Sequence, residues 1–401
     1  MAFAMQEFDF AIVGGGMVGS ILALALSRLV GPSTLKPRIL LLESRRPESI
    51  QHPGFDARAI ALSYGSQLAL QELDLWPLFS PGSAAIDSIH VSDRGHIGRV
   101  ELHASEYQLP QLGHVVELFG VGQRLLQRIE ETPAICYQAP AQVASLTQHP
   151  ERIVLQLASG EQATCRLLLL ADGGSSAWHE SLGLVWRQES YGQSAIIANL
   201  RTQGAQSGRA WERFTEAGPL ALLPLGDNRL SLVWSMTDTD ASSAMRWSDE
   251  QFLARLQQTF CYRAGRFVQV GERASYPLQL RQTQQTRHHR LLLLGNAAQQ
   301  LHPVAGQGFN LGLRDVMTLY HLLQPLWQEA VDPGRADLLQ TYSEQRQADV
   351  ARTVWMTSSL VRLFSSSAWP LVGGRNIGLA CMNRCGQLKE LLARQALGLA
   401  E

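Results

Sequence analysis

The beginning of the chain alternates short apolar runs with glycine-rich or polar segments. Residues 10–13 and 39–42 are continuous apolar runs of four, which is the length and composition of buried parallel strands. Between them, residues 17–30 are apolar over a helical length, and residues 31–37 form a loop that contains Gly, Pro, Ser and Lys. The pattern predicts a strand–helix–strand unit of a parallel sheet.

The rest of the chain predicts a mixture of helices and strands. We expect helices at residues 57–73 and 123–129, and strands within residues 86–102, 143–157 and 165–170. Residues 191–270 alternate strand-like pieces with polar turns, which is typical of an antiparallel sheet. A leucine run that begins at residue 291 resumes the buried parallel pattern, and helices are expected from residue 316 to the end.

These elements predict an α/β fold, of mixed α+β character, in which an antiparallel sheet interrupts a discontinuous parallel-sheet domain. We expect residues 5–75, 105–180 and 276–345 to form the discontinuous domain, and residues 76–104 and 181–275 to form the inserted sheet domain. Residues 346–401 are expected to form a C-terminal helical region.

Composition narrows the classes of function. The chain has 401 residues, of which 17% are charged, and a net charge of -1, so it resembles an ordinary globular protein and nucleic acid is not an expected partner. Its five cysteines form no CxxC pair, and we expect no metal site. No signal peptide precedes the first strand and no run of about 20 apolar residues occurs, so we expect a cytoplasmic protein.

A glycine motif follows the first strand. Gly14, Gly16 and Gly19 have the spacing GxGxxG between strand and helix, and Glu43 stands at the end of the next strand. In a dinucleotide site such glycines allow a tight turn, a close approach of the pyrophosphate and close packing of helix on strand, while the acid bonds a ribose. A purely structural turn is the alternative, and the motif alone does not separate NAD from FAD.

Two later segments have a related character. After the leucine run come a Gly-Asn turn, a loop with a proline, and Gly306-Gln307-Gly308 at the start of a predicted helix, whose N–H groups and positive dipole end favour an anion. Asp172-Gly173-Gly174 closes another buried strand, where a plain turn is an equally good interpretation. Together with the first motif, these segments suggest one extended cofactor that is held at both ends.

The motifs carry a family resemblance over nearly the whole chain. The strand–GxGxxG–helix–Glu43 start, Ala171-Asp172-Gly173, and the segment from Gly295 through His302-Pro303 to Asn310 resemble the class A flavoprotein aromatic monooxygenases, and within them the ubiquinone-biosynthesis hydroxylases. The family commonly has Gly-Asp and a later His in the third motif, where this chain has Gly295-Asn296 and Gln299. That form is most similar to the 2-octaprenyl-6-methoxyphenol hydroxylase branch.

The resemblance implies a Rossmann-like, three-layer FAD-binding domain and a role for each matching residue. Those that would hold FAD are Gly14, Gly16, Gly19, Glu43, Arg58, Gln123, Asp172, Asn296, Pro303, Gly306, Gln307, Gly308, Phe309 and Asn310. The first three glycines would hold the pyrophosphate and Glu43 the adenosine ribose, while Pro303 would wall the isoalloxazine ring and the last five residues would present N–H groups to its pyrimidine edge.

Some of these roles have open alternatives. Arg58 and Gln123 would lie along the phosphate and ribityl path, or they are surface residues. His302 is a candidate general base or a packing residue beside Pro303, and no other catalytic acid or base is evident. Asp315 would cap its helix or pair with Arg314 or another arginine on that helix, and a structural role is favoured.

The implied activity is the hydroxylation of the ring of a polyprenylated phenol, of the 2-octaprenyl-6-methoxyphenol type, in ubiquinone biosynthesis. It would use O2, with NAD(P)H as a transient electron donor, through a flavin C4a-hydroperoxide. A ring hydroxylase acting at another carbon, a reductase or halogenase of the same fold, and a flavin-binding scaffold subunit are the alternatives. Halogenases of this fold carry a Trp-x-Trp-x-Ile-Pro stretch, and this chain contains none, which argues against the halogenase alternative. Peripheral contact with the inner membrane, contact with other ubiquinone-biosynthesis proteins and a homo-oligomer are the partners to consider.

Overall fold

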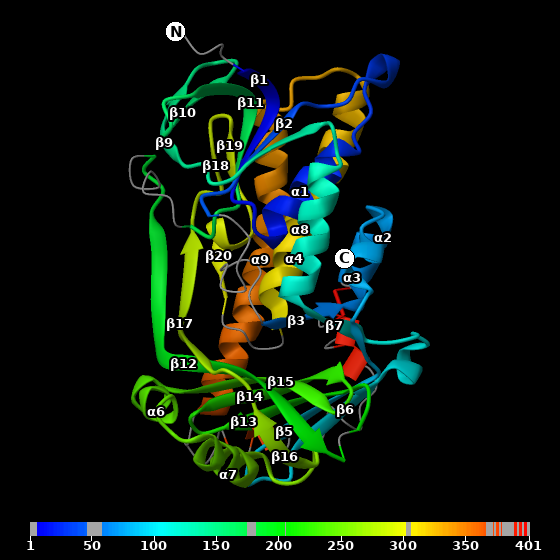
Figure 1. The fold of residues 1–401 in the computed structure, drawn as a ribbon, viewed down its shortest axis with the longest axis vertical. Coiled ribbons are helices and arrows are strands. Elements are labelled where there is room, and N and C mark those ends of the chain that lie inside the picture. Colours follow the sequence, from blue (N-terminus) through cyan, green and yellow to red (C-terminus); the bar gives the residue numbers. More distant parts are fainter. Residues whose placement is uncertain are drawn as a thin grey trace.

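The fold is described from a computed structural model. It describes residues 6–45, 58–174, 182–204, 206–301 and 306–365, and beyond these residues 372, 374–376, 378, 389–390, 393–394 and 397–398. The predicted α/β class is confirmed: a largely parallel sheet and a largely antiparallel one lie at opposite ends of the molecule (Figure 1).

The first sheet contains the predicted strand–helix–strand unit. Its strand order is β18-β19-β11-β1-β2-β8, the central pairs are parallel, and β9 and β10 extend it as an antiparallel hairpin beside β11. The strands are β1 (Gln6–Val13), β2 (Ile39–Leu42), β8 (Ile135–Gln138), β9 (Val143–Gln148), β10 (Ile153–Leu157), β11 (Gln162–Leu170), β18 (Arg287–His288) and β19 (Leu291–Leu293). The central strands are continuous apolar runs because both of their faces are covered.

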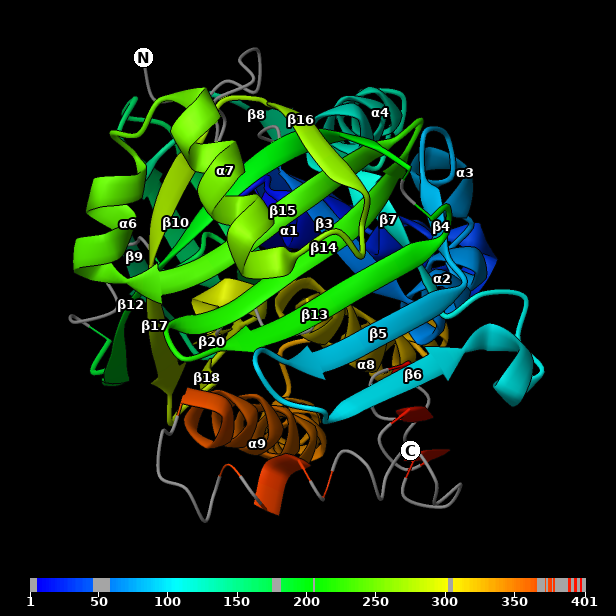
Figure 2. The ribbon, with the colours of Figure 1, turned by 90° about the horizontal axis from the view of Figure 1, so that it is seen from below.

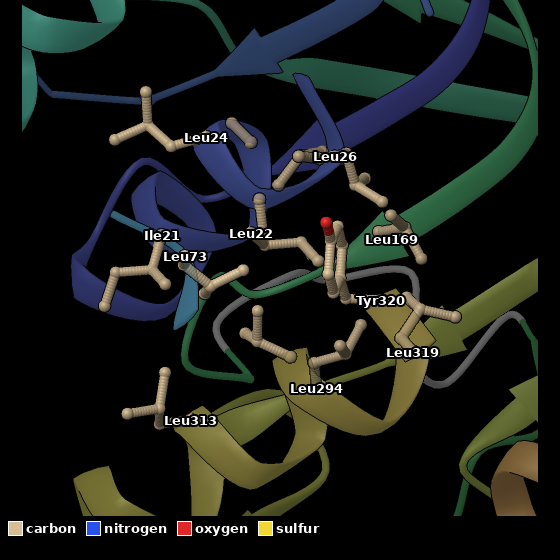
Figure 3. Close-up of a cluster of buried hydrophobic side chains, with 14 of the residues drawn as sticks. Ile21, Leu22, Leu24, Leu26, Leu73, Leu169, Leu294, Leu313, Leu319 and Tyr320 are labelled. Atoms are coloured by element: carbon tan, nitrogen blue, oxygen red, sulfur yellow. The ribbon is translucent and has the colours of Figure 1, made fainter. Parts of the chain in front are cut away.

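Helices α1 (Met17–Ser27), α4 (Leu118–Glu130) and α8 (Gln307–Gln328) pack together beside this sheet. Figure 3 shows the core that they form, with Leu22 and Leu26 of α1 near Leu169 of β11 and Leu319 of α8. These four side chains are fully buried, and each such burial contributes about 1.5–3 kcal/mol to stability. The core therefore fixes the first glycine turn relative to the beginning of α8.

The second sheet has the order β20-β17-β12-β15-β14-β13-β5-β6, with β16 beside β12, and only β13 and β5 run parallel. Helices α6 (Asp238–Ala244) and α7 (Asp249–Phe260) cover its outer face (Figure 2). Its strands are β5 (Ser88–Asp93), β6 (Arg99–His103), β12 (Trp186–Gln203), β13 (Arg209–Thr215), β14 (Gly218–Gly226), β15 (Arg229–Thr237), β16 (Arg266–Val270), β17 (Ala274–Thr283) and β20 (Gln299–Gln300). The predicted antiparallel insertion is thus confirmed.

A small third sheet corrects one predicted element. Residues 57–73 were expected to be one helix, but β3 (Ala59–Ser63) pairs with β7 (Gly113–Glu117), which also pairs with β4 (Ala84–Ile86). Helix α2 (Tyr64–Glu72) begins only after Ser63, whose side chain caps it. Ile60 and Leu62 are two residues apart, which fits a strand, and pairing with β7 outweighs the helical pattern of the neighbouring residues.

The remaining elements are short, except for one long helix. They are α3 (Trp76–Phe79), the 3-10 turns at Pro32–Thr34, Ala104–Tyr107 and Gly295–Ala297, and α9 (Ala336–Ser365). Helix α9 packs against α8, and both lie in the part of the chain where C-terminal helices were expected. None of the described helices combines the length and the apolar composition that crossing a membrane needs.

Candidate functional site

A cavity of about 1460 Å³ lies between the parallel sheet and the antiparallel one. Ligand pockets usually measure about 300–1,000 Å³, so this cavity has room for more than one small molecule. Eleven of the predicted site residues line it: Gly14, Gly16, Glu43, Arg58, Asp172, Asn296, Gly306, Gln307, Gly308, Phe309 and Asn310. The three glycine-containing segments therefore face one space.

Strand topology explains why segments so distant in sequence meet. In the parallel register Val13 of β1 pairs with Leu170 of β11, and Leu170 pairs with Leu293 of β19. The carboxyl ends of the three strands therefore lie at one edge of the sheet, and the loops that follow them share that edge. Ligands of open α/β sheets bind at this edge.

Two glycines of the first motif are required by packing. Gly14 has φ +105°, and a Cβ there would lie 2.6 Å from the backbone of Ala171. A Cβ on Gly19 would lie 1.9 Å from the carbonyl oxygen of Gly14, so Gly19 lets α1 approach the turn although it does not line the cavity. Gly16 lines the cavity and caps the N-terminus of α1. The turn leaves the backbone open to a ligand at Gly16.

Glu43 is 8% exposed and braces the same turn. Its Oε2 accepts the N–H of Gly15 at 2.8 Å, and its Oε1 accepts the N–H of Arg45 at 2.9 Å. A carboxylate that accepts backbone N–H bonds is held in one orientation. It lines the cavity beside the glycine turn, where a ribose would lie.

Arg58 lies at the cavity, whereas Gln123 does not. Arg58 is half-buried, lines the cavity, and places its guanidinium 5.1 Å from the centre of the Tyr276 ring. Gln123 is exposed on α4 and is not among the residues that line the cavity. A cation at Arg58 is well placed for a phosphate, whereas the predicted role of Gln123 stays a prediction.

Asp315 of α8 holds the third segment in place. Its Oδ2 accepts the N–H of Gly295 at 2.8 Å and the amide of Gln299 at 3.0 Å, and its Oδ1 lies 2.6 Å from Nε of Arg346 on α9. Burial opposes the charge of Arg346, but Asp315 and Asp349 raise its pKa above its ordinary value. The predicted structural role of Asp315 is confirmed, but its arginine partner is Arg346 of α9 and not Arg314 or another arginine of α8.

The start of α8 is fixed by Asn310. Its Oδ1 accepts the N–H of Ser63 at 3.0 Å and the hydroxyl of Ser66 at 2.7 Å, and its Nδ2 donates to the carbonyls of Ala61 and Gly306. Gly306 precedes the helix with φ +62°. The first N–H groups of α8 have no intrahelical acceptor, and they favour negative charge in the cavity. His302 and Pro303 lie outside the described residues.

The chain is similar to known proteins over most of its length. The FAD binding domain family matches residues 7–357, most of the chain. The ubiquinone hydroxylase UbiL of Rhodospirillum rubrum is 36% identical over 390 residues, covering 97% of this chain and 89% of that protein. The chain belongs to the FAD-dependent ubiquinone-biosynthesis hydroxylases.

Other relatives of this hydroxylase agree with that family. The 3-demethoxyubiquinol 3-hydroxylase of Escherichia coli is 30% identical over 395 residues, covering 98% of this chain and 99% of that protein. The crystal structure of p-nitrophenol 4-monooxygenase from Pseudomonas putida superimposes with a TM-score of 0.78 at 18% identity, covering 98% of this chain and 99% of that one, and so shares the fold. The predicted family, enzyme class and FAD cofactor are confirmed.

The residues present fit FAD. The cavity edge combines a glycine turn, a carboxylate at the end of the next strand, an arginine, and a helix N-terminus at the opposite loop. These groups suit, respectively, a pyrophosphate, a ribose, a phosphate and an electron-rich ring edge. FAD would thus extend between Gly16 and Gly306 past Asp172.

The far wall of the cavity comes from the antiparallel sheet. Alternation along the strands places Ile197, Ala221 and Val233 toward the cavity, whereas Leu222 and Leu232 point to the helices on the outer face. Leu220, Leu222, Leu232 and Trp234 belong to the core under α6 and α7, and Leu223 lines the cavity.

Sequence analysis missed one acidic residue of this wall. Glu212 of β13 lines the cavity, and burial in apolar surroundings raises the pKa of its carboxyl to about 8. The only sequence signal is a charged residue in the middle of the strand RAWERFT. Alternation could not reveal which face of this strand borders a cavity, because both faces carry large apolar residues.

Proposed function

We propose that the hydroxylase inserts one oxygen atom of O2 into the aromatic ring of a polyprenylated phenol, of the 2-octaprenyl-6-methoxyphenol type, with NAD(P)H as electron donor. The observation that carries the proposal is the continuity of the cavity. The cavity joins the loops that follow β1, β11 and β19, here called the FAD-side loops, to an apolar wall that includes Leu223 and Phe214. An apolar chain and an aromatic ring would find matching surroundings there.

When bound and reduced, FAD supplies the activated oxygen. The chain's own residues would position the two molecules. The N–H groups that begin α8 would stabilise negative charge at the pyrimidine edge, and the turn at Gly16 would hold the pyrophosphate. The apolar wall would exclude water from the reacting ring.

The predicted FAD roles of individual residues belong to this proposal. We assign Gly14 and Gly19 to the shape of the turn, Glu43 to the ribose, and Arg58 to the phosphates. The contacts that support these roles are the packing of the glycines, the hydrogen bonds of Glu43 and the place of Arg58 over Tyr276.

A second candidate function differs in the substrate and in the ring carbon that is hydroxylated. The relative from Escherichia coli carries the name 3-demethoxyubiquinol 3-hydroxylase and spans the same length as this chain. A demethoxyquinol that is hydroxylated at another position is therefore a competing substrate.

The decisive experiment uses the FAD-loaded protein, O2 labelled with oxygen-18, and two short-chain substrates, a prenylated methoxyphenol and a demethoxyquinol. NADPH and NADH are compared as reductants under anaerobic conditions before O2 is admitted. We expect one label in the ring of the methoxyphenol, and the position of the new hydroxyl decides between the two candidates. Hydrogen peroxide formation without a labelled ring would instead support the scaffold alternative.

The predicted contact with a membrane rests on the lipid character of the proposed substrate. Cosedimentation with vesicles of anionic and neutral phospholipid tests it, and we expect binding that the substrate analogue increases.

A further inference from the structure

Glu212 is an acidic residue in an apolar part of the cavity wall. It lies at the centre of β13, where it pairs with Ala221 of β14 on one side and Val91 of β5 on the other. Ala210 and Phe214, two positions away along β13, also line the cavity, so the alternation of the strand directs Glu212 toward the same space. Its immediate neighbours on that face are therefore all apolar.

The part of the chain that the structure describes offers Glu212 no compensating partner. Among the described residues, no hydrogen bond or ion pair involves its side chain, and burial alone accounts for the rise of its pKa to about 8. It keeps partial exposure because it borders the cavity instead of packing into the core. A buried polar group without a partner destabilises the folded state, and such groups are rare unless a ligand satisfies them.

The other charged and titratable groups of the cavity lie elsewhere. Those that line it within the described residues are Glu43, Arg45, Arg58, Asp172, Tyr276 and Arg375. The first four belong to the FAD-side loops or to their neighbours, and Arg375 is paired with Asp93 at 2.8 Å. None of them contributes a charge effect at Glu212.

We propose that the carboxyl group of Glu212 binds the phenolic hydroxyl of the substrate and so sets the orientation of the ring in the cavity. This inference rests on the proposed function, because it assumes a phenol as the ligand. The carboxylate would accept the O–H hydrogen bond and increase the electron density of the ring toward which oxygen is transferred. As the O–O bond of the activated oxygen breaks and the new carbon–oxygen bond forms, the phenolic proton would move to Glu212, and it would return to the same phenolic oxygen when the hydroxylated carbon loses its own proton to solvent and the ring regains its aromaticity.

The raised pKa suits this task. A carboxyl group that titrates near 8 lies within about two units of an ordinary phenol, so it is a stronger proton acceptor than an exposed glutamate. The accepting form becomes populated as the pH rises through about 8. A group with a purely structural role would show no such link to the ligand.

The test compares Glu212→Gln and Glu212→Leu with the wild type in the oxidised, FAD-loaded protein. Binding of a short-chain prenylphenol and of its methyl ether is measured from the change in flavin absorbance, between about pH 7 and pH 9. Glu216→Gln is the matched control, since Glu216 is an exposed glutamate just beyond β13. Glu212→Leu also tests the alternative that Glu212 serves to stabilise the fold. Removal of an unpaired buried carboxyl should raise the thermal stability, whereas loss of a stabilising residue would lower it.

We expect the wild type and the control to bind the phenol about tenfold or more tightly than the ether, with a preference that grows as the pH rises. Glu212→Leu should bind both ligands equally, and Glu212→Gln should keep a smaller preference that does not depend on pH. An unchanged preference in both variants would overturn the role of Glu212. If the preference for the phenol over the ether depends on Glu212 but the oxygen-18 experiment gives no labelled ring product, the proposed function is refuted and the binding role of Glu212 remains.

Discussion

The carboxylate of Asp315 on α8 lies 2.6 Å from Nε of Arg346 on α9, and both side chains are buried. The same carboxylate accepts the N–H of Gly295 in the loop that follows β19. One ion pair therefore joins the two long C-terminal helices to the edge of the FAD cavity. A buried pair of this kind is weak evidence for stability by itself, but loss of one partner leaves the other charge uncompensated.

Asp315→Ala should lower the free energy of unfolding by up to about 3–5 kcal/mol, because the buried Arg346 would keep only the more exposed Asp349 as a partner. The Gly295 N–H would also lose its acceptor, so excess FAD should raise the melting temperature less than in the wild type. Thermal unfolding with and without FAD measures both effects. Glu344→Ala removes an exposed carboxylate of α9 and should change neither. If Asp315→Ala is less stable but FAD raises its melting temperature as much as that of the wild type, the ion pair stabilises the fold without holding the loop at Gly295.

Gly19→Ala should prevent FAD retention. The new Cβ would lie 1.9 Å from the carbonyl oxygen of Gly14, so helix and turn must separate. Gly160→Ala is the matched control: it has φ +91° but nothing within 4 Å of its added Cβ, so only about 1 kcal/mol of backbone strain is expected. The ratio of FAD to protein after purification distinguishes the two variants, and an equal ratio would contradict the packing role of Gly19.

Glu43→Gln should weaken FAD binding about tenfold. Both carboxylate oxygens accept backbone N–H groups, from Gly15 and Arg45, and an amide would oppose one of them with a donor. Equilibrium titration of the apoprotein with FAD gives the dissociation constant. Glu151→Gln, at an exposed turn, should bind FAD as the wild type does. Equal affinity in both variants would remove Glu43 from the cofactor site.

Leu223→Ala and Leu222→Ala form a matched pair on opposite faces of β14. Leu222 is fully buried under the outer helices, so its truncation should cost about 2–5 kcal/mol of stability. Leu223 borders the cavity, so its truncation should cost less stability and raise the KM for a prenylated substrate several-fold. Denaturant unfolding and steady-state kinetics measure the two effects. A KM change confined to Leu222→Ala would place the substrate elsewhere.

His90 should make the protein sensitive to acid. It is 3% exposed, and burial lowers its pKa from 6.5 to about 4. Because the unfolded chain takes up the proton first, stability is complete above pH 6.5 and is lost as the pH falls toward 4, by up to about 3 kcal/mol for this group. His90→Asn should reduce the difference in unfolding free energy between pH 7 and pH 4.5, as measured in urea. The exposed His149→Asn should leave that difference unchanged.

Much of the FAD side could be predicted from the sequence. The strand that ends at Val13, the turn at Gly14 and the helix that begins at Met17 occupy the predicted places, as does the helix after Gly306. These features are local: an apolar run, a glycine with positive φ and a helix start need no distant partner to be recognised. The predicted domain limits and the roles of Gln123 and Pro303 stay predictions.

The sequence by itself determined the first strand–helix–strand unit, the three loops at the carboxyl ends of parallel strands and, through the family resemblance, the cofactor that suits them. Only the tertiary structure decided that residues 59–63 form a strand, that Asp315 meets Arg346, and that Glu212 borders the cavity. Each of these depends on a partner that is distant in the chain. A strand presents two faces with the same period, and which of them becomes core or cavity is fixed by what packs against it.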